Sequence, residues 1–298
     1  MLSAVERKIE QYIGELDDPL VNDLYRRLPH GKRLRAKLIL RISGSGLRAV
    51  KTAAVVEMIH AASLLHDDVI DDAYVRRSQP SINALYGNKT AIMLGDILYS
   101  KGFFELNGID KRIARIISNA VTQLSLGELN DVALAERFNR DKSLYMRMIY
   151  QKTASLIEAA AESAALLAGK SPEPYRVYGR NLGLAFQMVD DMLDISSDSK
   201  TLGKPALHDF VEGKTTLPYI YLHEKLGKEE QAVLMALHGK KLSNDEQEWI
   251  MRRMDKYQIL MQCYGEAKLL IDEAIELMSG AGEVELSDIA QDMIERDF

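Results

Sequence analysis

Two clusters of aspartate residues, each at the end of a helical pattern, most strongly constrain how this chain can fold. The first ends an apolar run over residues 50 to 72 and comprises Asp67, Asp68, Asp71 and Asp72. The second has the same D-D-x-x-D spacing and comprises Asp190, Asp191 and Asp194. Residues four apart share one face of a helix, so each cluster places carboxylates side by side. Such carboxylates repel one another unless a cation lies between them.

The rest of the sequence reads almost entirely as helix. It lacks the sustained period-two alternation that marks strands, and its seven prolines mostly fall where helical patterns begin or break. No repeat of 20 to 50 residues is visible, and no linker is long or biased enough to separate domains. We therefore expect an all-α fold, a single domain that spans residues 1 to 298.

Composition limits the possible classes of function. The net charge of -6 argues against a general nucleic-acid-binding protein. Cys263 is the only cysteine, so no intrachain disulfide can form and a reducing compartment is expected. Charged residues interrupt any signal-peptide pattern near the start, and no stretch reaches the roughly 18 apolar residues of a spanning helix. We expect a cytoplasmic protein without a transmembrane segment.

The chemistry of the two clusters favours Mg²⁺. Carboxylates supply oxygen ligands alone, without the His or Cys that softer metals prefer, and Mg²⁺ is commonly shared with a phosphate. Basic residues that suit such a phosphate are spread along the chain: Lys32, Arg35, Arg76, Arg77, Lys152, Lys204 and Lys214. Acidic clusters and bases around an apolar interior indicate a ligand with an anionic headgroup and an apolar tail.

These patterns also have structural interpretations. The first cluster could be a solvated helix end that pairs with Arg76 and Arg77, although the second cluster weakens that interpretation. The segment from Gly31 to Arg35 could be a solvated basic turn or a phosphate site at a helix start, and the residues alone leave both open.

The chain resembles the trans-isoprenyl diphosphate synthases. Five segments carry the resemblance in the family's order: G-K-R-L-R (31–35), I-H-A-A-S-L-L-H-D-D-V-I-D-D followed by R-R-S-Q-P-S (within 59–82), K-T (152–153), G-L-A-F-Q-M-V-D-D-M-L-D (183–194), and G-K-P with D-F-V-E-G-K-T-T-L-P (203–218). The resemblance implies an isoprenoid-synthase helical bundle around a central cavity. It also implies a homodimeric, Mg²⁺-dependent prenyltransferase that joins isopentenyl diphosphate to an allylic diphosphate.

The resemblance implies a role for each matching residue. Three Mg²⁺ ions on the allylic diphosphate would be held by Asp67, Asp71 and Asp190, with Asp194 as a further metal ligand and Asp68 and Asp191 in support. The allylic diphosphate would contact Arg76, Lys152, Lys204 and Lys214. Isopentenyl diphosphate would contact Lys32, Arg35, His60 and Arg77. Thr153 and Gln187 would lie near the developing allylic cation.

The chain departs from the family pattern at three positions. Leu207 stands where the family usually has glycine, Phe210 replaces a usual leucine, and Asp131 lies where a glutamine often follows Gly127-Glu128. Leu207 is expected to stiffen or reshape its loop, and the sequence gives no account of Asp131.

Product length is expected to depend on Ala62 and Ser63, which lie about one turn before Asp67. Both are small, whereas short-chain members resembling this chain carry aromatic residues there. Small residues would let a growing chain pass, so we expect a product on the order of six to nine isoprene units, about one helical turn each. Such products typically serve as quinone side chains. Phe103, Phe104 and Phe138 are candidates for a deeper floor, although for any one of them an ordinary core aromatic is the favoured interpretation.

Three alternatives remain. A geranylgeranyl- or farnesyl-type synthase would share the chemistry and stop at a shorter product. A non-catalytic subunit of a heteromeric synthase would not need both aspartate motifs and all the bases. A terpene cyclase would normally lack the second motif and the G-K-R-L-R segment. For the enzyme itself we expect no nucleic-acid partner and a transient membrane contact during product release.

Overall fold

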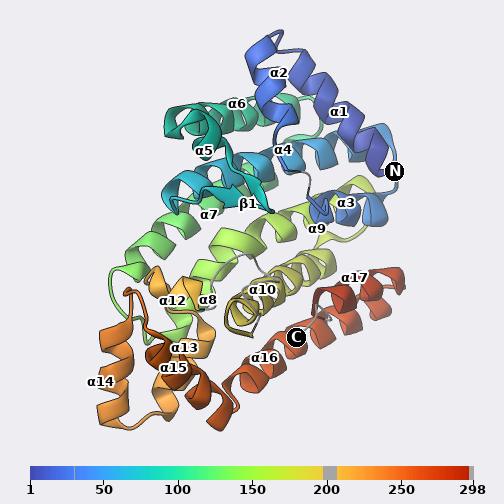
Figure 1. Ribbon diagram of the computed structural model, residues 1–298. Helices are drawn as coiled ribbons and strands as arrows, with labels where there is room; N and C mark the ends of the chain where they lie inside the picture. The colour runs from blue at the N-terminus through green and yellow to red at the C-terminus, as the bar shows by residue number, and fades with distance from the viewer. Residues whose placement is uncertain (30, 197–206, 295–298) are drawn as a thin grey trace. The chain divides into compact units, whose positions relative to one another are not determined.

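The structure is a computed structural model that describes residues 1–29, 31–196 and 207–294 (Figure 1). Nearly all of this part is helical, and its strands β1 (Val75–Arg76) and β2 (Gln79–Pro80) form one short hairpin. The predicted all-α class is confirmed. Contacts divide the chain into two compact units, residues 1–122 with 156–176 and residues 123–155 with 177–298. The assignment of one domain to residues 1 to 298 stays a prediction.

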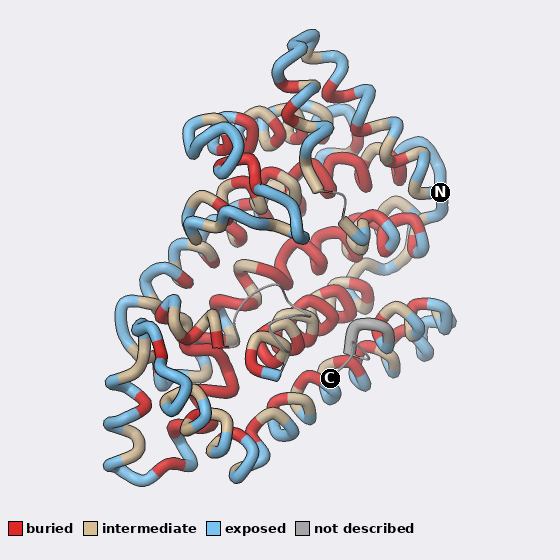
Figure 2. The backbone as a smooth tube through the Cα atoms, in the orientation of Figure 1, coloured by how far each residue is buried: buried red, intermediate tan, exposed pale blue. Residues whose placement is uncertain are grey.

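The first unit is built around α4. Its elements are α1 (Leu2–Gly14), α2 (Pro19–Arg26), α3 (Leu34–Ser43), α4 (Leu47–Ile70), the hairpin, α5 (Ile82–Tyr86), α6 (Asn88–Leu106), the first part of α7 (Lys111–Ala135), most of α9 (Ser155–Leu167) and the start of α10 (Pro172–Ser196). Most of α4 is buried (Figure 2), and it packs mainly against α6 and also against α3 and α1. A helix that is apolar around its whole circumference is typical of such a buried position.

The hairpin reverses the chain directly after the first aspartate motif. Val75 pairs with Pro80, and the two turn residues, Arg77 and Ser78, have φ of 52° and 60°. Two consecutive positive φ values are those of a type I′ turn, whose twist matches that of the flanking strands. The hairpin thereby places Arg76 and Arg77 next to the end of α4.

The second unit carries the second aspartate motif near the end of α10. Its other elements are the rest of α7, α8 (Lys142–Ile149), the π-helix η1 (Tyr150–Ala154), α12 (His208–Val211), α13 (Leu217–Lys225), α14 (Lys228–Leu237), α15 (Asn244–Lys256), α16 (Ile259–Gly280) and α17 (Glu285–Ile294). Helix α16 packs against α13, α15 and α17. The π-helix contains Lys152 and Thr153, and π-helical turns frequently occur at functional sites.

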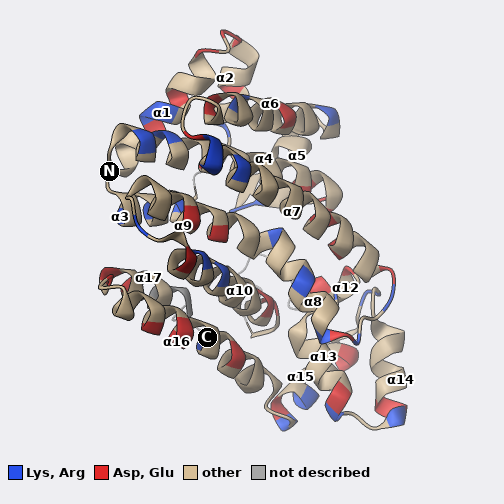
Figure 3. Ribbon diagram, turned by 180° about the vertical axis from the view of Figure 1, so that it is seen from behind, with Lys and Arg blue, Asp and Glu red and all other residues tan. Residues whose placement is uncertain are grey.

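Charge is distributed over both units. Figure 3 shows Lys and Arg interspersed with Asp and Glu along the helices, in a chain whose net charge is -6. Within the described ranges, no helix combines the length and apolar character needed to cross a membrane.

Candidate active site

The first aspartate motif is anchored through Asp68. Asp68 is only 4% exposed, and Arg76 donates to its Oδ1 through Nε and Nη2, both at 2.6 Å. The Nδ2 group of Asn83, in α5, donates to the backbone carbonyls of Asp68 and Ala73 at 3.0 Å each. Asp67, on α4, and Asp71, the residue that follows the last one of α4, remain half-buried. Asp68, at the second position of D-D-x-x-D, therefore has a structural role, while Asp67 and Asp71 stay partly accessible.

The hairpin also connects this motif with the G-K-R-L-R segment. Arg77 Nη1 donates to the carbonyl of Pro29 at 3.0 Å. A Cβ atom at Gly31 would lie 2.7 Å from the same Nη1, so a larger residue there would displace the guanidinium. Two of the predicted motifs are thus brought side by side, as the resemblance implied.

Arg35, His60 and Arg77 form a basic cluster in the first unit. Burial first, and then the charge of Arg35 and of Arg77, hold the pKa of His60 well below 6.5, so its imidazole is neutral at pH 7. Arg35 Nε is buried and has no hydrogen-bond partner among the described residues. Burial and the charge of Arg77 lower the pKa of Arg35, although Glu57 raises it. Guanidinium groups crowded this way, one with an unused buried donor, suit an anion. Lys32 is exposed beside them.

Arg33 has a structural role that was not predicted from the sequence. It adopts φ of 52°, and it pairs with Glu6 at 2.7 Å and with Glu57 at 3.4 Å. Glu57 is buried and also accepts from the Ala36 backbone N–H at 2.9 Å. Glu57 and His60 have the Glu-x-x-His spacing of a di-iron ligand pair, but Glu57 is committed to these partners. The sequence feature that could have indicated a structural role for Arg33 is Glu57, an acidic residue within an apolar helical run.

The residues expected to control product length lie on α4. Ala62 is fully buried, and the Ser63 hydroxyl donates to the His60 carbonyl at 2.9 Å. Of the candidate floor residues, Phe104 is 70% exposed and Phe103 stacks on Tyr99, with ring centroids 6.3 Å apart. Phe104 therefore does not line the interior of the first unit.

In the second unit, Lys152 lies between two carboxylates. Its Nζ is 2.6 Å from Asp131 Oδ2 and 3.0 Å from Glu128 Oε2. This gives a physical account of the departure at Asp131. Its carboxylate forms an ion pair with Lys152, whereas the family's glutamine would offer Lys152 only an uncharged contact. Glu128 Oε1 is buried without a hydrogen-bond partner in the described chain.

Two glycines allow neighbouring helices to approach the π-helix. A Cβ atom at Gly127, in α7, would lie 2.3 Å from the Lys152 backbone nitrogen. One at Gly183, in α10, would lie 2.5 Å from Ala154 Cα. Real Cβ atoms do not approach this closely, so only glycine fits at either position. The positions of Lys152 and Thr153 depend on this close packing.

The second aspartate motif is anchored through Asp191, which is also 4% exposed. Its oxygens accept from the Tyr145 hydroxyl at 2.6 Å and from Gln187 Nε2 at 2.8 Å. Gln187 Oε1 accepts from the Thr153 hydroxyl at 2.7 Å. Burial, followed by the charge of Asp209, raises the pKa of Asp191 well above its usual range, despite these two donors. Thr153 and Gln187, predicted as partners in function, are in direct contact.

The backbone conformation of Leu207 explains why the family prefers glycine at this position. Leu207 has φ of 62°, a conformation that glycine adopts without strain, so the family's preference for glycine has a backbone cause. Leu207 is fully buried, and its N–H donates to the Asp194 carbonyl at 3.0 Å. Phe210 is also buried and stacks on Tyr219 at 4.4 Å. Burial of these side chains offsets the strain.

Lysine and carboxylate side chains line a cavity of about 90 Å³ within the second unit. Its polar lining residues are Asp131, Tyr145, Lys152, Gln187, Asp191, Asp209, Lys214, Thr215 and Thr216. Lys214 Nζ lies 3.0 Å from Glu212 Oε2. Lys204, predicted to bind the same diphosphate, lies outside the described residues.

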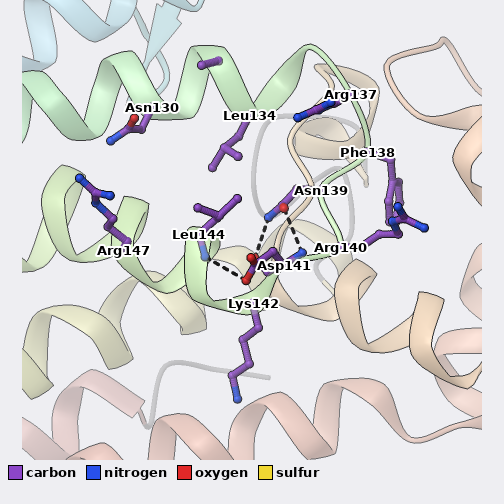
Figure 4. Close-up of a pocket in the computed structure, with 11 residues that line it drawn as sticks. Asn130, Leu134, Arg137, Phe138, Asn139, Arg140, Asp141, Lys142, Leu144 and Arg147 are labelled. Carbon is purple, nitrogen blue, oxygen red and sulfur yellow. Dashed lines mark hydrogen bonds between the residues drawn. The ribbon is translucent and has the colours of Figure 1, made fainter.

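A second, larger cavity of about 740 Å³ lies between the ends of α7 and α8 (Figure 4). The exposed Arg137, Arg140 and Arg147 line it, together with Leu134 and Leu144. Lys142 points away from these residues and bonds Glu266 at 2.7 Å. Its lining includes Phe138, one of the candidate floor residues, and none of the residues predicted to bind metal or diphosphate.

The aspartate motifs are chemically suited to Mg²⁺. Both offer oxygen ligands, and in both the aspartates at the first and fifth positions of D-D-x-x-D are half-buried while the one at the second position is buried. Throughout the described ranges, however, no three His, Cys, Asp or Glu side chains converge as a metal-binding group. The metal set Asp67, Asp71, Asp190 and Asp194 therefore stays a prediction.

Comparisons with known proteins agree with the motifs. A model of the polyprenyl synthetase family matches residues 18–254. The chain is 37% identical over 228 residues to a short chain isoprenyl diphosphate synthase of Methanothermobacter thermautotrophicus, covering 72% of this chain and 69% of that protein. It is 38% identical over 216 residues to octaprenyl diphosphate synthase of Escherichia coli, covering 70% and 67%. The crystal structure of octaprenyl pyrophosphate synthase from Helicobacter pylori matches with a TM-score of 0.94 at 43% identity, covering 99% and 98%.

Proposed function

The chain belongs to the polyprenyl synthetase family, and we propose that it condenses isopentenyl diphosphate with an allylic diphosphate to make a long-chain all-trans polyprenyl diphosphate. The basic cluster of Arg35, His60 and Arg77 carries this proposal. A protein that ionises a single diphosphate has no need for a second anion site, whereas a condensing enzyme must hold two. The cluster therefore favours chain elongation over cyclisation.

The allylic diphosphate would be bound through the aspartate motifs and nearby bases. Mg²⁺, about three ions per site, would be held by Asp67, Asp71, Asp190 and Asp194, and when bound it would neutralise charge on the departing pyrophosphate. Arg76, Lys152, Lys204 and Lys214 would add positive charge to the same group. Arg76 is suited to this because its pair with Asp68 holds the guanidinium in one place.

The carbocation step would depend on Thr153 and Gln187. Ionisation of the carbon–oxygen bond leaves an allylic cation, which hydroxyl and amide oxygens stabilise and which apolar walls protect from water. Lys32, Arg35, His60 and Arg77 would hold isopentenyl diphosphate so that its double bond attacks this cation. The proton then lost from the condensed product would pass to the departing pyrophosphate.

The finer assignments form part of the same proposal. Small side chains at Ala62 and Ser63 favour a product on the order of six to nine isoprene units, at about one helical turn for each unit. Such a product would supply quinone side chains. The enzyme would act in the cytoplasm as a homodimer, with a transient membrane contact for release of its apolar product. Exposed apolar residues on α6, Ile92, Met93 and Phe104, support a protein contact on that helix.

The alternative is a shorter-chain synthase, as in the relative from Methanothermobacter thermautotrophicus. Purified protein would be incubated with Mg²⁺, farnesyl diphosphate and excess labelled isopentenyl diphosphate, and the products separated by chromatography. A ladder that ends at a long polyprenyl diphosphate is expected. A stop at the geranylgeranyl stage would favour the alternative. Absence of any Mg²⁺-dependent product with any allylic primer would favour a non-catalytic subunit of a heteromeric synthase.

The product-length proposal has its own test, the substitution Ala62→Tyr. A tyrosine at this buried position should block the growing chain and shorten the final product by several isoprene units. The control is Ala61→Tyr, on the neighbouring face of α4, which should leave the product unchanged. Equal product distributions from wild type and Ala62→Tyr would reject the role of Ala62.

A further inference from the structure

Tyr145 is a buried tyrosine that was not among the predicted site residues, and it ends a series of short hydrogen bonds in the second unit. It lies in α8, is fully buried, and donates its hydroxyl to Asp191 Oδ2 at 2.6 Å. The other oxygen of Asp191 accepts from Gln187 Nε2 at 2.8 Å. Gln187 Oε1 accepts from the Thr153 hydroxyl at 2.7 Å. Four side chains, from α8, η1 and α10, therefore form one connected network.

The carboxylate determines which way the network is polarised. Both oxygens of Asp191 accept hydrogen bonds in this network, so Asp191 engages the NH₂ end of the Gln187 amide. The carbonyl end then faces Thr153 and accepts its single hydroxyl proton. The lone pairs of Thr153 Oγ1 are left to face away from the network, and no described residue donates to them. An oxygen in this orientation presents negative charge, which stabilises a developing cation.

Tyr145 completes this arrangement. Asp191 is 4% exposed, so water does not readily replace a missing donor. Without the Tyr145 hydroxyl, the carboxyl group would lose one of its two donors and would be free to rotate away from Gln187. The amide could then turn, and its NH₂ end would face Thr153, which would reverse the polarity at the hydroxyl oxygen.

We infer that Tyr145 is a positioning residue for carbocation stabilisation, because it holds Asp191 in the orientation that makes Gln187 direct the Thr153 oxygen toward the cation. The inference rests on the proposed function, in which Thr153 and Gln187 lie beside the reacting carbon. In this role Tyr145 needs no contact with substrate. It acts through three side chains, and each link in that series is a hydrogen bond of 2.8 Å or less.

The test compares Tyr145→Phe with a matched control, Tyr178→Phe. Tyr178 is another fully buried tyrosine of the second unit, and its hydroxyl donates to the Leu286 carbonyl at 2.8 Å, outside this network. Steady-state kinetics with farnesyl diphosphate should show kcat lowered about tenfold by Tyr145→Phe, which corresponds to ~1.4 kcal/mol in the barrier. KM for farnesyl diphosphate should change little. Tyr178→Phe should keep wild-type kcat, and an equal loss of kcat in both variants would overturn the inference.

A double-mutant cycle separates this role from ordinary packing. Once Thr153→Val has removed the hydroxyl, Tyr145→Phe should lower kcat little further, because both changes disable the same series of contacts. Losses that multiply independently would contradict the inference. If circular dichroism shows Tyr145→Phe to be unfolded, Asp191→Asn replaces it in the cycle with Thr153→Val, and the same coupling is expected. Wild-type and Tyr178→Phe turnover report on the proposed function separately, since neither lacks Tyr145.

Discussion

The two aspartate motifs have the same spacing, and their second aspartates, Asp68 and Asp191, are equally buried at 4% exposure. Their partners differ in charge. Asp68 is held by the guanidinium of Arg76 at 2.6 Å, whereas Asp191 is held by two neutral groups, the Tyr145 hydroxyl and the Gln187 amide. A charged partner compensates a buried carboxylate directly, and neutral donors compensate it only in part.

This difference shows that one local pattern can do two structural jobs. In the first motif, the buried Asp68 fixes the position of the Arg76 guanidinium, which the proposed mechanism uses to bind the allylic diphosphate. In the second, it orients a neutral amide and leaves its own charge poorly compensated, which agrees with the raised pKa of Asp191. The outer aspartates are half-buried in both motifs, so the proposal assigns metal binding to them in either case.

The largest expected effect tests what the two motifs have in common. Asp67→Asn and Asp190→Asn should each lower kcat about a thousandfold, or ~4 kcal/mol in the barrier, because each removes a proposed Mg²⁺ ligand. The matched control is Asp72→Asn, which changes an exposed residue with φ of 47°, a conformation that asparagine tolerates well. Steady-state kinetics at several Mg²⁺ concentrations would measure all three variants. Near-normal turnover in either motif variant would refute the shared metal role.

A smaller effect tests the charged anchor of the first motif. Arg76→Met should lower the free energy of unfolding by about 2–3 kcal/mol, since it leaves Asp68 buried without a cation. The value lies at the low end for a broken buried pair because the Arg76 side chain is 27% exposed. Arg77→Met, at the exposed turn of the same hairpin, should cost about 0.5 kcal/mol or less. Urea-induced unfolding measures both, and equal losses would show that the Asp68 pair is not the anchor.

The smallest expected effect concerns pH and the second motif. Because the pKa of Asp191 is raised in the folded state from its ordinary value of 3.8, the folded protein retains a proton that the unfolded chain has lost. Stability from this group is therefore present below pH 3.8 and is lost as the pH rises toward the raised pKa. Asp191→Asn should flatten the pH dependence of the unfolding free energy over that interval, by up to about 1.4 kcal/mol per pH unit.

The pH experiment needs a chelator, so that no divalent ion alters the charge beside Asp191. Asp72→Asn, which removes an exposed carboxylate, should keep the wild-type slope. A slope in Asp191→Asn as steep as in wild type would mean that Asp191 does not titrate differently on folding.

Much of the architecture followed from local patterns. The helical class and the apolar helix before Asp67 could be predicted because helices show as patterns in consecutive residues, without reference to distant parts of the chain. The family resemblance implied one site for Thr153 and Gln187, and the structure joins the two side chains by a hydrogen bond. The other role assignments, including the metal ligands and Lys204, stay predictions.

Other features depended on residues far apart in the chain. Arg33 meets Glu6 and Glu57 because α1, α3 and α4 pack together, and Gly127 must be glycine because the backbone of Lys152 passes close by. Neither requirement leaves a local pattern, since the partners lie more than twenty residues away.

The sequence by itself determined an all-α chain with two acidic motifs and the bases that accompany them, because spacing along a helix sets which side chains share a face. Only the tertiary structure decided what each buried aspartate bonds. Asp68 and Asp191 have identical local spacing, but their partners are delivered by a hairpin in one case and by a facing helix in the other. Partner chemistry in a buried site is a property of packing, and the packing is settled by the whole unit.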